Sequence, residues 1–183
     1  MPDAEHIRPS PSSFLRRVRA AGGRVGSELQ AFVEPDLVPL AWGYADRNGP
    51  YRKEIGRLLV GSVSREDRPL VLDLMDREVA AARAGGETEQ ARTLLGFLLY
   101  RIGEVEDALA VWRAKTSSPD GLFAVDVQLV VGAGVSETIG FLERQGTEEA
   151  MRAALYLIEC ETTGDFADLD RHFEGWDDES AWS

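Results

Sequence analysis

The chain has 183 residues, of which 44% are hydrophobic, and a formal net charge of −12. A chain of this length can bury a core without disulfides or a structural metal. It contains no apolar run of the roughly 18 residues that a membrane-spanning helix needs, and its beginning, MPDAEHIRPSPSS, lacks the apolar segment of a signal peptide. We therefore expect a cytoplasmic protein without a membrane partner.

The acidic charge is concentrated in the second half of the chain. Residues 87–183 hold 7 basic and 20 acidic side chains. Such a surface repels nucleic acid, so we expect no nucleic-acid partner and consider a basic protein instead. The alternative is that the charge only keeps the protein dispersed. Of the 20 basic residues only Lys53 and Lys115 are lysines, a bias that suggests a GC-rich, bacterial source.

Apolar residues recur at helical spacing along most of the chain. After a disordered leader at 1–12, the pattern predicts helices at residues 13–20, 36–46, 51–60, 64–84, 89–102, 105–115, 119–132, 136–144, 148–162 and 166–174. The run VDVQLVVGAGV at 125–135 is the one place where β-branched residues could favour a strand; we interpret it as helix. Residues 13–174 are expected to form one all-α domain, followed by a C-terminal tail at 175–183.

Several helix boundaries carry their own signals. Ser64 and Asp67 match a capping box, and Thr88 and Thr147 stand where a helix-capping side chain is expected. Gly103 follows the helix at 89–102, and glycine is the residue that most readily adopts the left-handed conformation in which helices end.

Residues 89–119, EQARTLLGFLLYRIGEVEDALAVWRAKTSSP, carry the most informative pattern. A Leu-Gly pair is followed by a small residue, an aromatic residue and a closing proline, namely Leu95-Gly96, Ala108, Trp112 and Pro119. In type and spacing these residues resemble one helix-turn-helix unit of a tetratricopeptide repeat. The match departs from the family at Arg92, where a Trp is usual, at Leu99, where a Tyr is usual, and at Pro119, which falls one residue early.

The small residues and the glycine spacing extend this interpretation. Gly96 and Ala108 would let two helices approach closely. Gly103, Gly134 and Gly164 are separated by 31 and 30 residues, a period that favours three stacked helical pairs. The predicted fold is all-α, with antiparallel helical pairs stacked as a short α-solenoid; the alternative is a globular helical bundle.

No residue pattern predicts catalysis, a metal or a cofactor. His172 with the nearby acids at 165, 168 and 170 is the best metal candidate, but no recognised ligand spacing completes it. Cys160 lies on an apolar helix face and is expected to be a buried thiol rather than a nucleophile. The glycine pairs lack the Lys-Ser/Thr of a phosphate-binding loop.

Two groups of residues are candidates for binding a partner. In tetratricopeptide repeats the first helix of each pair lines a groove, and the resemblance implies the groove residues Gln90, Thr93, Phe97, Tyr100 and Arg101. The alternative is that Phe97 and Tyr100 pack against the next helical pair. The second group is the tail, with the candidate residues Trp176, Asp177, Asp178, Glu179 and Trp182, which would either anchor a basic partner or fold back as a cap on the last helix.

These observations favour a scaffold or adaptor that binds a protein or peptide through a helical-repeat groove. A first alternative is an acidic antagonist or immunity-type protein that neutralises a basic partner. A second is an enzyme with unrecognised residues, which would need a pocket that gathers carboxylates with shifted pKa values. The oligomeric state and the identity of the partner are not indicated by the sequence.

Overall fold

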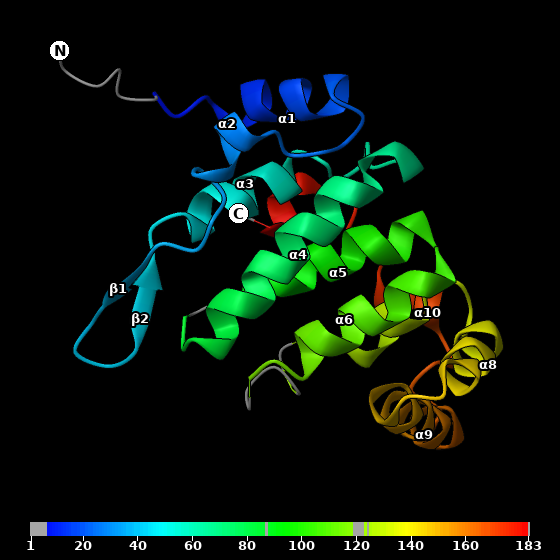
Figure 1. Cartoon of the computed structure of the whole chain (residues 1–183). Helices are drawn as coiled ribbons and strands as arrows, with labels where there is room; N and C mark the ends of the chain where they lie inside the picture. Colours follow the sequence, from blue (N-terminus) through cyan, green and yellow to red (C-terminus); the bar gives the residue numbers. More distant parts are fainter. Residues whose placement is uncertain (1–6, 87, 119–122, 124, 183) are drawn as a thin grey trace, which may run out of the picture.

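The computed structural model describes residues 7–86, 88–118, 123 and 125–182, and these are mostly helical (Figure 1). The helices and strands in chain order are α1 (Pro11–Ala20), α2 (Ser27–Gln30), β1 (Leu37–Pro39), β2 (Tyr44–Asp46), α3 (Gly49–Arg57), η1 (Arg65–Asp67), α4 (Arg68–Arg83), α5 (Glu89–Ile102), η2 (Val105–Asp107), α6 (Ala108–Lys115), η3 (Val127–Val131), α8 (Val135–Gln145), α9 (Glu148–Thr163), α10 (Leu169–His172) and η4 (Glu179–Trp182). Among the described residues, no helix is both long and apolar enough to cross a membrane.

Helices α4 and α5 form the centre of the molecule. Helix α5 also packs on α3 and η3, and α4 packs on α6. Helix α1 covers α3, while α8 and α9 pack on each other at one end of the molecule and the β1–β2 hairpin projects from the other (Figure 1). The core is continuous from Phe14 of α1 to Leu157 of α9.

The helix predicted at 36–46 is wrong, because these residues form an antiparallel hairpin. Leu37 pairs with Asp46, Val38 with Ala45 and Pro39 with Tyr44. Proline disfavours the helical conformation in the residue that precedes it, so Val38, which precedes Pro39, is better placed in a strand. Gly43 adopts a φ of +88° in the turn, a conformation that suits glycine.

The helix predicted at 119–132 is also corrected. Within that range the structure describes Phe123 as helical and residues 127–131 as the short 3-10 helix η3, which ends before Gly132; Gly134 follows with a φ of +104°. Residues 119–122, which include the closing Pro119 of the repeat pattern, lie outside the described residues. The helix predicted at 166–174 is reduced to the four residues of α10.

The first helix begins two residues before its predicted start at residue 13. Helix α1 begins at Pro11, and the Tyr51 hydroxyl donates a hydrogen bond to the Pro9 carbonyl oxygen (2.8 Å). Residues 1–6, which include His6, lie outside the described residues. The Arg19 guanidinium of α1 bonds the Asp67 carboxylate at 2.7 and 2.9 Å, and the same carboxylate accepts from the Ser64 amide, as the predicted capping box requires.

The predicted unit at 89–119 contains the helices α5 and α6. Helix α5 has the predicted bounds, and Gly103 ends it with a φ of +74°. A Cβ on Gly96 would lie 3.2 Å from Leu129 Cδ1, so this glycine admits η3 close to α5. A Cβ on Gly132 would lie 2.7 Å from Tyr100 Cα, so a second glycine brings the other end of the same segment against the α5 backbone.

Candidate functional site

The predicted groove face of α5 is covered by the chain's own C-terminus. Phe97 is only 1% exposed, and its ring centroid lies 5.5 Å from that of Trp176 and 5.9 Å from that of Trp182. The Trp182 indole N–H donates to the Trp176 carbonyl oxygen (2.9 Å). We call residues 173–182 the C-terminal segment; it folds back on α5, whereas the cap alternative placed it on the last helix.

Ion pairs hold the charged residues of this segment. Arg101 pairs with Asp177, and Arg57 of α3 pairs with Glu179 (2.6 Å). Asp178 accepts a hydrogen bond from the Ser180 amide (2.8 Å). The acidic groups predicted to meet a basic partner therefore already contact basic groups or backbone of the same chain.

A shallow cavity of about 660 Å³ remains beside the segment, lined by Tyr100, Arg101, residues 168–171 and residues 173–175 and 177. Burial raises the pKa of Tyr100. His172 lies 3.2 Å from the Asp126 carboxylate rather than in an acidic ligand set. Within the described ranges, no three His, Cys, Asp or Glu side chains are grouped as a metal site would require.

The other predicted groove residues lie elsewhere. The Thr93 hydroxyl donates to the Glu89 carbonyl oxygen within α5 (3.0 Å). Gln90 accepts from the Lys53 ammonium of α3 (2.8 Å) and lines a second cavity. The structure therefore brings Phe97, Tyr100 and Arg101 together with the C-terminal segment but leaves Gln90 and Thr93 outside that cluster.

This second cavity, the hairpin pocket, has a volume of about 730 Å³. Its lining residues come from the hairpin, the start of α3, α4 and the first turn of α5. Its lining residues are Leu40, Tyr44, Ala45, Asp46, Gly49, Pro50, Lys53, Glu78, Thr88, Glu89, Gln90 and Ala91.

A buried charge cluster adjoins the hairpin pocket. Arg52 donates from Nε to Glu78 Oε1 (2.7 Å), from Nη2 to Asp46 Oδ2 (2.5 Å) and from Nη1 to the Val33 carbonyl oxygen (3.1 Å). The three charged side chains are at most 2% exposed. Within the described part of the chain, the second Glu78 oxygen, Oε2, is buried without a hydrogen-bond partner.

The two carboxylates have pKa values shifted in opposite directions. Burial raises the pKa of Glu78, against the attraction of Arg52. Burial also acts on Asp46, but hydrogen bonds from Arg52 and from the Asp36 and Asn48 amides outweigh it and lower the pKa of Asp46. Such a pair is what the enzyme alternative needs. Arg52 bonds both carboxylates, so the same guanidinium holds the two groups in place.

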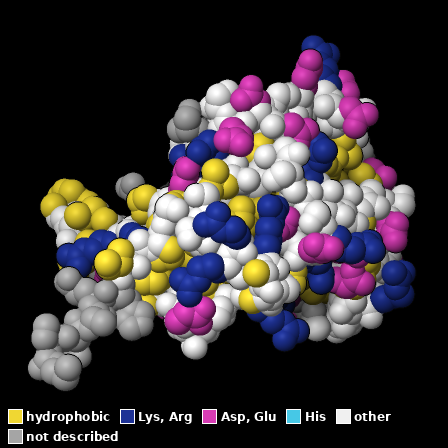
Figure 2. Space-filling view, turned by 90° about the horizontal axis from the view of Figure 1, so that it is seen from above, with side chains coloured by type: hydrophobic (Ala, Val, Ile, Leu, Met, Phe, Trp, Pro, Cys, Tyr) yellow, Lys and Arg dark blue, Asp and Glu magenta, His cyan; other side chains and the backbone are white. Residues whose placement is uncertain are grey.

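The rim of the pocket is apolar and exposed. Leu40 is 55% exposed, Trp42 at the hairpin turn 93% and Tyr44 42%. Seen from above, hydrophobic side chains gather at this projecting end of the molecule (Figure 2). Aromatic residues so exposed are unusual on a surface that contacts only water, and they are typical of binding surfaces.

The first turn of α5 faces the same pocket. Thr88 stands before the helix, as predicted, but its hydroxyl does not cap the first amides, because it donates to the Glu78 carbonyl oxygen (3.5 Å). Amides at a helix start have no partner within the helix. The first residues of α5, Glu89, Gln90 and Ala91, line the pocket together with Glu78.

Comparison of the chain with family models, with curated proteins and with solved structures finds no match. The tetratricopeptide resemblance of residues 89–119 therefore stays a prediction.

The hairpin pocket was missed by the sequence analysis. The charges of Asp46, Arg52 and Glu78 lie within 32 positions of each other in the chain, and nothing in the helical pattern marks them as neighbours. One signal was present: Glu78 and Arg52 both fall on the apolar faces of their helices, among Val79 and Ile55. Two opposite charges on buried faces predict an ion pair.

Proposed function

We propose that this protein is a helical protein-binding adaptor and that the hairpin pocket takes a basic side chain of its partner. The observation that supports the proposal is that Glu78, whose Oε2 is buried and has no hydrogen-bond partner among the described residues, is one of the residues that line a pocket with an apolar rim. Three carboxylates and two cations line or underlie the pocket (Asp46, Glu78 and Glu89; Arg52 and Lys53). The excess of one negative charge favours a cationic group.

The shape and lining suit an arginine or lysine side chain in a peptide. Leu40, Pro50 and Ala91 can cover an aliphatic stem, while the charged end of such a side chain donates to Glu78. A peptide carbonyl oxygen can accept from the first amides of α5. A peptide therefore supplies both a cationic donor for Glu78 and a carbonyl acceptor for the α5 amides. The exposed side chain of Trp42 offers additional apolar contact beside the pocket.

The proposal changes the binding surface that the sequence favoured. The α5 groove residues Phe97 and Tyr100 are packed under the C-terminal segment, so the hairpin replaces them as the contact. The acidic-antagonist alternative shares this surface, since a basic partner is common to both. We also propose that the helices are stacked as a solenoid, which the packing of α5 on α6 and of α8 on α9 supports. We further propose a cytoplasmic location, which the single, buried thiol of Cys160 supports.

Affinity capture with matched baits tests the proposal. Two variants each remove one exposed apolar side chain: Trp42→Ser on the hairpin, and Phe123→Ser between α6 and η3 as the matched control. We expect a basic partner to be captured by wild type and Phe123→Ser and lost with Trp42→Ser. Capture that is the same with all three baits would contradict the proposed surface.

A further inference from the structure

Helix α9 exposes an apolar stripe on its outer face. Met151 is 44% exposed, Leu155 60% and Ile158 39%. At about 100° per residue these three side chains fall within an arc of about 60°. The opposite face of α9, with Ala153 and Leu157, is buried.

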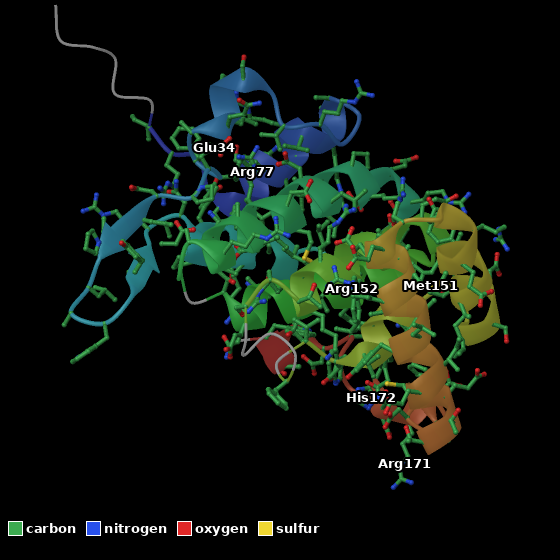
Figure 3. The ribbon with its side chains drawn as sticks, turned by 60° about the horizontal axis from the view of Figure 1, so that its bottom comes forward. Glu34, Arg77, Met151, Arg152, Arg171 and His172 are labelled. Carbon is green, nitrogen blue, oxygen red and sulfur yellow. The ribbon has the colours of Figure 1, made fainter. Side chains whose placement is uncertain are left out.

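No described element covers this stripe. Helix α9 lies on the viewer's side in Figure 3, where Met151 and Arg152 are labelled. After α9 the chain turns at Gly164, which has a φ of +88°, and runs back to Phe97 of α5 instead of over α9. The end of the helical stack is therefore left with an apolar face in solvent.

The charges beside the stripe identify its occupant. Arg152 and Glu159 lie on the same flank of α9, about 20° apart around the helix and about 10 Å apart along it. Both side chains are exposed, and within the described residues neither lies within ion-pair distance of an opposite charge; the Arg152 charge does help, after Arg113 and Arg83, to lower the pKa of Glu149. Their positions are equidistant from a point between Leu155 and Tyr156.

We propose that α9 pairs with α9 of a second copy of this chain, antiparallel about a two-fold axis at that point. In this register Leu155 packs beside Leu155 of the second copy, and Met151 and Ile158 of each copy extend the apolar contact. A two-fold axis keeps the same flank of both helices on one side of the contact. Arg152 of each copy then faces Glu159 of the other, which gives two equivalent ion pairs.

The contact is small. Three partly exposed side chains per copy bury less than the roughly 1,200 Å² at the low end of specific interfaces, and exposed ion pairs add little affinity but fix the register. We therefore expect a dissociation constant on the order of 10–100 µM. This contact is separate from the hairpin pocket, so either can fail without the other.

Sedimentation velocity tests the contact at protein concentrations from roughly 5 to 500 µM, a range chosen to span the expected dissociation constant. Wild type should pass from monomer to dimer, and Leu155→Asp should stay monomeric. Arg152→Glu alone and Glu159→Arg alone should each weaken dimerisation about tenfold, because both ion pairs become repulsions. An equimolar mixture of these two variants should dimerise again, since every Glu then faces an Arg.

Circular dichroism of the variants checks that each is folded; all three positions are exposed, so unchanged spectra are expected. A wild type that is monomeric at all concentrations would overturn the proposal. So would a dimer that persists in Leu155→Asp. A dimer that is lost in Leu155→Asp but does not respond to either charge reversal, or is not restored in the mixture, would overturn the antiparallel register.

Discussion

Trp182→Ala should destabilise the protein far more than Trp42→Ala, although both remove the same side chain. Trp182 is 9% exposed and packs on Phe97 and Trp176, whereas Trp42 is 93% exposed. Removing a buried Trp costs about 3–5 kcal/mol. We expect about 3 kcal/mol, the low end of that range, because the segment lies near the chain end and can relax. For Trp42 we expect at most about 0.5 kcal/mol.

Urea denaturation followed by circular dichroism measures both changes in the free energy of unfolding. For Trp42→Ala, the slope of the free energy of unfolding against urea concentration should be the same as in wild type. Removal of Trp182 also uncovers Phe97, so the variant should bind more of a hydrophobic dye than wild type does. Equal losses in the two variants, or a loss below about 1 kcal/mol for Trp182→Ala, would refute the claim that the C-terminal segment seals the α5 face.

Three further predictions concern single residues. Gly132→Ala should lower the free energy of unfolding by about 1–3 kcal/mol in urea, because its Cβ would meet Tyr100 backbone atoms at 2.7 and 2.9 Å; a neutral effect would contradict this close approach. Burial raises the pKa of Tyr51 to about 12, so the stability that the neutral ring contributes is present below pH 10 and lost as pH rises toward 12. Tyr51→Phe, which also loses the hydrogen bond to Pro9, should be about 1 kcal/mol less stable at pH 7, with a gap that closes in denaturation curves between pH 10 and 12; a constant gap would refute the buried hydroxyl. Burial raises the pKa of the Cys160 thiol, so a thiol reagent should modify it about 100-fold slower in the native than in the unfolded protein, and fast native modification would show that the α9 core face is open.

The helices that the sequence predicted best have local signals at both ends. Helix α5 runs over the predicted residues because apolar residues fill its interior and Gly103 ends it; Thr88 precedes it in a non-helical conformation, although its side chain does not cap the helix. Helices α8 and α9 match within one residue for the same reason, with Thr147 accepting a hydrogen bond from the Ala150 amide (3.2 Å). Where the signals at the helix ends agree with the packing, the spacing of apolar residues is sufficient to predict where a helix begins and ends.

The hairpin shows where local pattern is insufficient. Residues 36–46 have helical spacing of apolar side chains, but their conformation depends on Asp46, which accepts from the Asp36 amide (2.9 Å) and from Arg52. Arg52 is held in turn by Glu78 of α4. Contacts between residues far apart in the sequence determine the conformation of residues 36–46, and the spacing of apolar residues carries no information about these contacts.

The candidate site was predicted in part. The C-terminal tryptophans were expected either to bind a partner or to fold back, and the structure shows Trp182 packed on Phe97. The sequence could not place this contact on α5 rather than on the last helix, because the turn at Gly164 sets the direction of the chain after α9. The hairpin pocket follows from the same kind of long-range placement.

A titration with short peptides tests the hairpin pocket most directly. Ac-Gly-Arg-Gly-amide and its citrulline analogue have side chains of nearly the same shape, but only the first is charged. Nitrogen-15 NMR spectra of the full chain should show shifts at Tyr44, Thr88, Gln90 and Ala91, with a dissociation constant on the order of 1 mM for the arginine peptide.

The citrulline peptide should bind at least about tenfold more weakly, and Glu78→Gln should remove most of this difference, because the negative charge of this side chain is then lost. The spectrum of the variant itself shows whether it is folded. Shifts at these four residues that depend on the charge of the peptide and on Glu78 are the predicted result. Equal binding of both peptides, shifts confined to other surfaces, or no shifts at 20-fold that concentration, roughly 20 mM, would contradict a pocket for a basic side chain.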